Sequence, residues 1–273
     1  MNKGMKSLGV VLLTLCTGLA TISCRQQAVE EEVWIENGDR KIYGVLNRPD
    51  GGRKQRPLLI ISHGFNGSHE FGRNYFDCLG EIGYLCYAFD FGCGSLGSKT
   101  DNNTMEMSIL DECEDLKAVI RHFRSCPDVD PDRIVLLGES QGGLVSALVA
   151  DEMPDAVSSL ILVFPALCIP DNWNRIYPSV EDIPDTTRLW DVPIGRRFFT
   201  EIRDMDVFRH TDRFDNPVLI VQGDKDPVVS LEDSRRAVEL YDDARLHVIA
   251  GAGHGFSPNE FEESLKQIRS FLK

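Results

Sequence analysis

The sequence predicts an α/β fold: a mostly parallel sheet, opened by an antiparallel hairpin and covered by helices on both faces. Three observations predict it. Short apolar, β-branched runs such as residues 58–61 and 134–137 have the composition of strands buried on both faces. Such runs alternate with helical stretches, as in sheets whose parallel strands are joined by crossover helices. Asn37-Gly38 lies between two alternating segments near the start, which is a strong hairpin signal.

The elements follow from the period of the apolar residues. The predicted strands are residues 33–35, 41–47, 58–61, 84–89, 134–137, 159–164, 217–222 and 246–250. The predicted helices are residues 75–82, 105–124, 144–150, 231–241 and 260–272. The helix at 105–124 has the clearest pattern, because Ile109, Leu116 and Phe123 recur on one face.

Residues 166–212 interrupt this alternation with several prolines and many charges. An insertion between strands is where a lid or cap over a site is commonly found. Its aromatic residues Trp173, Tyr177 and Trp190 either line a substrate pocket or only pack the small core of the insertion. Both interpretations remain open from the sequence.

Length and charge restrict the class of protein. A chain of 273 residues is long enough for one α/β domain with a large core, here residues 33–273. Acidic residues exceed basic ones by 43 to 29, and no Lys/Arg-rich run or nucleic-acid-binding signature is present, which argues against a nucleic-acid partner. The six cysteines after Cys24 form no disulfide framework, so we expect buried free thiols.

Residues 1–24 are predicted to be a targeting segment that is not part of the fold. A basic start precedes an apolar stretch at 8–22, which is short for a membrane span, and Cys24 follows. The segment resembles a bacterial lipoprotein signal. The resemblance implies export, lipidation of Cys24, a polar tether at 25–32, and an anchor on the periplasmic or cell-surface side of a bacterial membrane. Secretion after ordinary cleavage near Ala20 or Ser23 is the alternative.

Gly-Glu-Ser-Gln-Gly at 138–142 matches the pattern G-x-S-x-G between a predicted strand and a predicted helix. This context predicts a nucleophile elbow, in which the two glycines remove side chains that would collide where the chain reverses. A helix that starts at Ser140 also brings unpaired N–H groups beside an oxyanion formed there. Ser140 is therefore the predicted nucleophile.

A serine needs a histidine base that is held in turn by a carboxylate. Asp224, Asp226 and His254 lie in the loops after two predicted strands, and loops at the carboxyl ends of parallel strands share one edge of the sheet. We favour Asp226 as the acid because Asp224 directly follows the strand and suits a turn. A divalent cation at the two aspartates would lack further ligands, so no metal is predicted.

Two backbone N–H groups are the predicted oxyanion donors, those of Phe65 and Gln141. Phe65 lies in the loop after an early strand, which His63 is expected to brace by hydrogen bonds. Residues 92–97 match G-x-G-x-x-G, but a polar loop follows them instead of a helix, so we predict a tight loop rather than a nucleotide site. No cofactor is predicted.

From residue 33 to the end, the chain resembles the α/β-hydrolase superfamily, and within it bacterial cinnamoyl (feruloyl) esterases and related serine carboxylesterases. The segments that carry the resemblance are residues 63–69, 89–95, 130–133, 138–143, 223–228 and 253–255. The resemblance implies the α/β-hydrolase fold with a lid insertion at 166–212. It also implies a triad of Ser140, Asp226 and His254 with Phe65 and Gln141 as oxyanion donors. Cys93 and Glu139 depart from the residues usual in these esterases.

The predicted activity is cofactor-free hydrolysis of a small-molecule ester through an acyl-enzyme, with hydroxycinnamoyl (feruloyl) or other small acyl esters as substrates. A serine peptidase of the prolyl-oligopeptidase type shares the elbow and the triad and is one alternative. A non-catalytic, ligand-binding surface lipoprotein is the other, and it would be expected to have lost a triad residue.

Overall fold

The computed structural model describes residues 28–49, 55–209 and 213–273. The predicted targeting segment, with Cys24, and the first residues of the predicted tether lie outside the described residues. Nothing in the fold therefore tests the prediction of a targeting segment with a lipidated Cys24.

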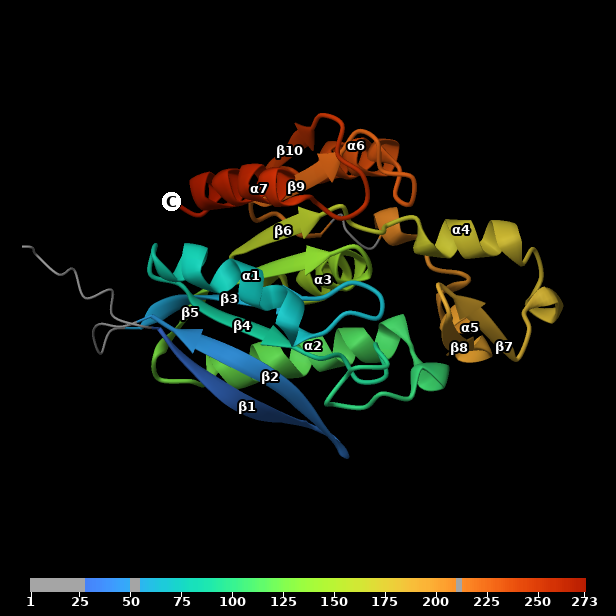
Figure 1. Ribbon diagram of the computed structural model, residues 1–273, viewed down its shortest axis with the longest axis horizontal. Coiled ribbons are helices and arrows are strands. Elements are labelled where there is room, and N and C mark those ends of the chain that lie inside the picture. The colour runs from blue at the N-terminus through green and yellow to red at the C-terminus, as the bar shows by residue number, and fades with distance from the viewer. Residues whose placement is uncertain (1–27, 50–54, 210–212) are drawn as a thin grey trace, which may run out of the picture.

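The core is an eight-stranded sheet in the order β1-β2-β4-β3-β5-β6-β9-β10 (Figure 1). Its strands are β1 (Val29–Asn37), β2 (Arg40–Arg48), β3 (Arg56–Ser62), β4 (Leu85–Phe89), β5 (Val129–Glu139), β6 (Ser159–Val163), β9 (Val218–Gly223) and β10 (Ala244–Ile249). The β1–β2 and β2–β4 pairs are antiparallel and all other neighbours are parallel. The predicted mostly parallel sheet with an opening hairpin is confirmed.

Helices cover both faces of this sheet. On one face lie α1 (His69–Gly80) and α7 (Pro258–Phe271), and on the other lie α2 (Ile109–Arg124), α3 (Gln141–Glu152) and α6 (Leu231–Leu240). Successive strand residues point to opposite faces, so Leu59 and Ile61 pack with the first group while Leu58 and Ile60 pack with the second. Double-sided burial explains why these strands are continuous apolar runs.

The first strand is longer than predicted. It begins at Val29 instead of Val33, and Glu30, Glu31 and Glu32, which were expected to lie in the tether, pair with β2. The prediction failed here because β1 is an edge strand, whose backbone hydrogen bonds hold it in the sheet while its side chains stay in water. Three consecutive acidic residues are compatible with such a strand, although they look like a solvated linker in sequence.

The long amphipathic segment at 105–124 is divided into two elements. Residues Thr104–Glu106 form a 3₁₀ turn, η1, and α2 starts only at Ile109. Met107 is the C-cap of this turn. Ser108, whose backbone is extended, caps α2, because its Oγ accepts a hydrogen bond from the backbone N–H of Asp111. This cap fixes which residues of α2 face the core.

The insertion lies together at one end of the molecule, at the right in Figure 1, past the carboxyl ends of the parallel strands. Its elements are α4 (Ile169–Ile176), η3 (Val180–Asp182), β7 (Thr186–Leu189), β8 (Val192–Gly195), α5 (Arg196–Ile202) and η4 (Val207–Arg209). The β7–β8 hairpin was not predicted. Its turn residues Trp190 and Asp191 both have positive φ, 46° and 65°, where hairpins usually carry Asn-Gly or Asp-Gly.

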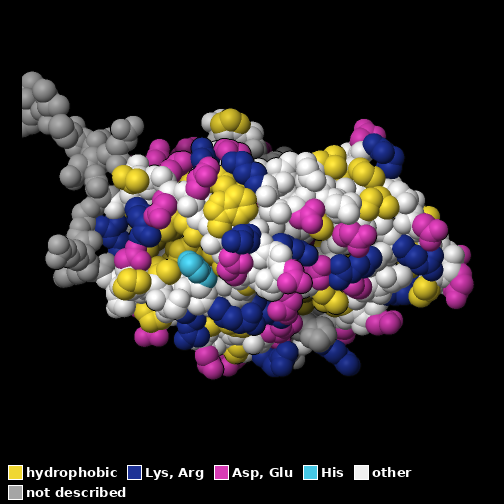
Figure 2. Space-filling model, turned by 90° about the horizontal axis from the view of Figure 1, so that it is seen from below, with side chains coloured by type: hydrophobic (Ala, Val, Ile, Leu, Met, Phe, Trp, Pro, Cys, Tyr) yellow, Lys and Arg dark blue, Asp and Glu magenta, His cyan; other side chains and the backbone are white. Residues whose placement is uncertain are grey.

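The surface carries charges of both signs, interleaved rather than separated, on the face shown in Figure 2. Among residues 28–49, 55–209 and 213–273, no helix combines the length and the apolar character that crossing a bilayer requires. The cysteines in these ranges are free, and four of them are buried: Cys86, Cys93, Cys113 and Cys168.

Candidate active site

Ser140 stands on a strained turn between β5 and α3. Its backbone has φ 49° and ψ −116°, a region that residues with a side chain rarely adopt. The flanking glycines are required by close packing. A Cβ atom at Gly142 would collide with the carbonyl oxygens of Ser62 and His63, and one at Gly138 would collide with the carbonyl of Gly142. The G-x-S-x-G pattern is thus a consequence of close packing within the turn at Gly138 and of the turn against the end of β3 at Gly142.

The structure brings together the three residues predicted to form a triad. The Oγ of Ser140 lies 3.0 Å from Nε2 of His254, and Nδ1 of the same ring lies 2.9 Å from Oδ2 of Asp226. The ring of Phe164 packs against the imidazole, with 4.9 Å between centroids. This arrangement allows the imidazole to accept the proton of the hydroxyl while the carboxylate holds its other nitrogen.

The carboxylate of Asp226 is surrounded by hydrogen-bond donors. Oδ1 accepts from the backbone N–H groups of Val228 and Val229, at 2.8 and 2.9 Å. Oδ2 accepts from His254 and from Nε2 of Gln222, the latter at 3.1 Å. Asp224 instead accepts from the backbone N–H of Gly251 at 2.7 Å and so shapes the loop that carries His254. The choice of Asp226 over Asp224 therefore agrees with the geometry.

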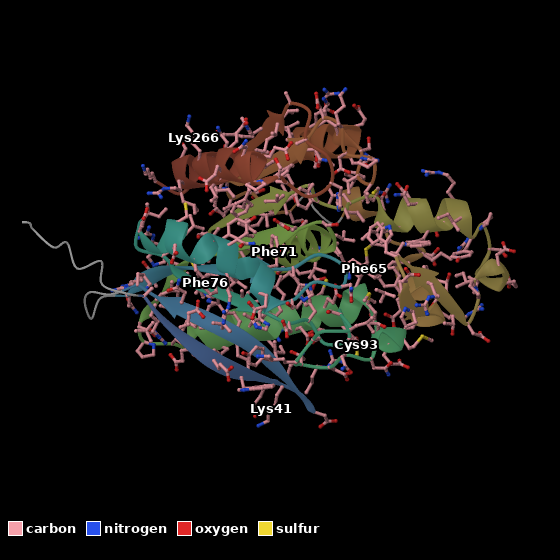
Figure 3. All side chains as sticks on the ribbon, in the orientation of Figure 1. Lys41, Phe65, Phe71, Phe76, Cys93 and Lys266 are labelled. Carbon is pink, nitrogen blue, oxygen red and sulfur yellow. The ribbon has the colours of Figure 1, made fainter. Side chains whose placement is uncertain are left out.

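The two predicted oxyanion donors flank Ser140. Gln141 is the first residue of α3, so its N–H has no partner within the helix. The loop that carries Phe65 runs directly against Ser140, since a Cβ atom at Gly64 would lie 3.2 Å from the Cβ of Ser140. Figure 3 shows Phe65 where the sheet meets the insertion.

His63 holds this loop, as predicted. Its Nδ1 lies 2.7 Å from the carbonyl oxygen of Gly64, and its Nε2 accepts a hydrogen bond from the backbone N–H of Phe91 at 3.2 Å. Burial lowers the pKa of His63, which favours the neutral ring that this pair of contacts needs. The loop after β3 is thereby tied to the loop after β4.

A cavity of about 280 Å³ opens in front of Ser140. Its walls are largely apolar and come from the insertion, with Ile169, Trp173 and Ile176 on α4 and Leu189 and Trp190 on the β7–β8 hairpin. The ring of Trp190 also lies edge-on to Phe65, with 5.7 Å between centroids. Two of the three predicted aromatic residues therefore face the cavity.

Tyr177 is the exception among these aromatics. It stacks on Trp173 at 6.0 Å and lies edge-on to Phe199 at 5.4 Å, and it belongs to the small core of the insertion instead of the cavity wall. Tyr177 is the C-cap of α4, where the backbone leaves the helix. A larger cavity of about 500 Å³ lies beside the β1–β2 hairpin, but it is polar and remote from Ser140.

The burial of two carboxyl groups at the elbow was not predicted from the sequence. Glu139 accepts a hydrogen bond from the hydroxyl of Tyr75 at 2.8 Å, and Glu112 on α2 contacts the side chain of Gln141. Burial raises the pKa of each to about 8. A signal for Glu112 was present, because it lies three residues after Ile109 and four before Leu116 and hence on the apolar face.

Comparison with known proteins shows the family to which this chain belongs. The family model described as serine aminopeptidase, S33, matches residues 53–198, more than half of the chain, and a model described as TAP-like protein matches residues 200–273. The structure of Est1E from Butyrivibrio proteoclasticus with ferulic acid bound is similar, with a TM-score of 0.79 and 26% identity over 87% of this chain and 98% of that one.

Two curated relatives match over shorter stretches. The quorum-quenching protein AidA of Acinetobacter baumannii is 29% identical over 113 residues, 41% of this chain and 36% of that protein. The uncharacterized peptidase YtmA of Bacillus subtilis is 24% identical over 170 residues, 59% of this chain and 62% of that protein. By its family model and its fold, the chain belongs to the serine aminopeptidase S33 family and is an α/β-hydrolase that resembles Est1E.

Proposed function

We propose that this hydrolase is a serine carboxylic ester hydrolase that acts through an acyl-enzyme. The main support for the proposal is the pair of hydrogen bonds made by His254. Its Nε2 lies 3.0 Å from Oγ of Ser140, and its Nδ1 lies 2.9 Å from Oδ2 of Asp226. Ser140 Oγ adds to the ester carbonyl as its proton passes to Nε2 of His254. The oxyanion is stabilised by the N–H groups of Phe65 and Gln141.

The intermediate then collapses by breaking the bond to the alcohol, which leaves with the proton from His254. Water next adds to the acyl group on Ser140 as its proton passes to His254. Collapse of this second intermediate breaks the bond to Oγ, returns the proton to Ser140 and releases the carboxylic acid. The steps need no cofactor.

The cavity in front of Ser140 suits esters of small apolar or aromatic acyl groups, including hydroxycinnamoyl (feruloyl) groups. Its volume of about 280 Å³ and its apolar walls suit such a group, and Trp173 and Trp190 offer rings for stacking. The ferulic acid bound by the similar protein Est1E supports the same class.

The direct test combines turnover with covalent labelling. The purified protein is assayed with p-nitrophenyl acetate, p-nitrophenyl butyrate and methyl ferulate, and then treated with a fluorophosphonate probe followed by peptide mapping. We expect ester turnover and a probe adduct on Ser140. A protein that neither turns over any of these esters nor reacts with the probe would be the non-catalytic ligand-binding protein instead.

A peptidase is the second candidate, favoured by the description of the matching family model and by the name of YtmA. The same three residues would cleave an amide by the same route. Hydrolysis of aminoacyl or dipeptidyl p-nitroanilides, together with an absence of ester turnover, would establish this activity in place of the esterase.

Removing the indole of Trp190 should weaken binding of aromatic esters. This side chain is 62% exposed at the tip of the hairpin, so Trp190→Ala should leave the fold intact while removing one wall of the cavity. We expect KM for methyl ferulate to rise about 5- to 10-fold, and KM for p-nitrophenyl acetate to change less than about 2-fold. Trp34→Ala is the matched control, since Trp34 is 50% exposed on β1 and does not line this cavity. Equal effects on both esters would contradict a stacking role.

We also propose that the protein is exported and anchored by lipid on Cys24. The feature that supports this is the basic start and the apolar stretch before that cysteine. Cys24→Ala should abolish incorporation of labelled palmitate and make processing insensitive to globomycin. Release of fully processed wild-type protein into the medium, without label, would favour simple secretion.

A further inference from the structure

Glu112 is a buried carboxyl group whose hydrogen-bonding partner is the residue that follows the predicted nucleophile. Its exposed fraction is 0%, on the core-facing side of α2. Both of its carboxyl oxygens lie within hydrogen-bonding distance of Nε2 of Gln141, at 2.8 and 3.0 Å. The Sδ of Met107 lies 3.8 Å from the same nitrogen, so the side chain of Gln141 is held from two elements.

Apart from the amide of Gln141, whose hydrogen bond lowers the pKa of Glu112, the surroundings of this carboxyl group disfavour a charge. On α2, Asp111 is paired with Arg197 and Asp115 with Arg40, while the thiol of Cys113 is neutral because burial raises its pKa. The loop after β4 presents the backbone at Gly94, where an added Cβ would lie 3.1 Å from Oε1 of Glu112 and 3.4 Å from Cε1 of His63. Burial lowers the pKa of His63, so this ring is neutral too. Among the described residues, no ion pair joins Glu112 to a cation, and burial raises its pKa to about 8.

Gln141 links this carboxyl to the reaction centre. Its side chain contacts Glu112, and its backbone N–H is one of the two proposed oxyanion donors. A rotation of the first turn of α3 would move both together, because a single residue carries both groups. An oxyanion donor is effective only when it is held in position before charge develops.

We propose that Glu112 is a positioning residue for hydrolysis, which holds Gln141 so that its N–H faces the developing oxyanion and supports that oxyanion only while the carboxyl is protonated. The inference rests on the proposed serine mechanism. Once Glu112 ionises, its negative charge lies behind the oxyanion site in a poorly solvated region, where like charges repel strongly.

The expected pH dependence follows from the direction of the pKa shift. Because the folded protein holds this proton up to about pH 8, ionisation of Glu112 should not affect activity below that pH and should lower activity above it. The same shift means that folding favours the protonated acid, so stability from this group also falls as pH rises from its ordinary pKa of 4.5 toward 8.

The test compares three variants by the pH profile of kcat for p-nitrophenyl butyrate, with butyrate release measured by chromatography. Glu112→Gln cannot ionise, so it should keep kcat within about 2-fold at pH 7 and lose the decline above pH 8. Glu112→Ala should lower kcat about 10-fold at pH 7 with little change in KM, as expected when a donor that acts in the transition state is misplaced. Glu114→Gln, an exposed change on the same helix, should keep the wild-type profile.

Two results would overturn the inference: an alkaline decline that persists in Glu112→Gln, or a Glu112→Ala variant that raises KM and leaves kcat unchanged. Glu139→Gln is assayed as well, because the pKa of Glu139 is also raised to about 8. If the alkaline decline in kcat is lost in Glu139→Gln and kept in Glu112→Gln, the role of Glu112 is rejected.

Thermal unfolding shows which variants fold. If Glu112→Ala does not fold, the pH profile of Glu112→Gln decides the question. If the wild type shows no turnover that depends on Ser140, the proposed function has failed instead. The rate of fluorophosphonate labelling then replaces kcat as the readout.

Discussion

Ser140→Ala is expected to lower kcat for p-nitrophenyl butyrate by about 10⁴- to 10⁶-fold. The hydroxyl oxygen, Oγ, is the atom that would bond to the acyl group. Alanine has neither this oxygen nor its 3.0 Å contact with His254. Alanine keeps the Cβ atom, so the strain of a positive φ at this position is unchanged and the fold should be retained. The measurement is steady-state turnover together with a melting curve of the purified variant.

The second readout for this variant is covalent. The wild-type protein should gain the mass of one fluorophosphonate adduct on the peptide that contains Ser140, and the variant should gain none. A Ser140→Ala protein that melts like the wild type and still turns over the ester at a comparable rate would eliminate Ser140 as the nucleophile.

Asp226→Asn is expected to lower kcat by about 10⁴-fold, the second-largest effect. All four contacts to this carboxylate come from donors: Val228 and Val229 on Oδ1, and His254 and Gln222 on Oδ2. An asparagine must place its own NH₂ group against one of these pairs. If the NH₂ faces His254, it favours the tautomer that cannot accept the proton of Ser140.

Asp224→Asn is the matched control for this change. Asp224 uses a single oxygen, Oδ1, to accept from the N–H of Gly251 at 2.7 Å, and the Oδ1 of asparagine can do the same. We expect kcat within about 3-fold of the wild type, since no contact to the reaction centre is altered. A large loss in Asp224→Asn and a small one in Asp226→Asn would exchange the roles of the two aspartates.

Local chemistry made the elbow and the loops predictable from sequence. Gly138 and Gly142 are needed because their neighbours approach too closely for any side chain, and this need is visible in the sequence as a fixed spacing around Ser140. Asp226 and His254 each follow an apolar strand, and parallel strands end at one edge. Each of the three segments that carry Ser140, Asp226 and His254 can be recognised from its own residues. Their contact follows because the strands before them end at the same edge of the sheet.

The insertion was only partly predictable. Its place between β6 and β9 and its aromatic content were visible in the sequence, but the β7–β8 hairpin was not, because Trp190 and Asp191 adopt positive φ without any glycine. Trp173 and Tyr177 both pack against Phe199, but the sequence could not show that Trp173 also lines the cavity while Tyr177 does not. Both are aromatic residues at helical spacing, and only their neighbours distinguish them.

The class of fold, the strand–turn–helix unit around Ser140 and the residues that could act with it were predictable from the chain alone, because these depend on local periodicity and on glycines at close approaches. Three features became visible only in the folded molecule: which aromatic residues of the insertion line the cavity, the extension of β1 back to Val29, and the contact of Glu112 with Gln141. These are contacts between segments far apart in the chain, and their energies depend on which side chains share a buried space, which the order of residues alone does not specify.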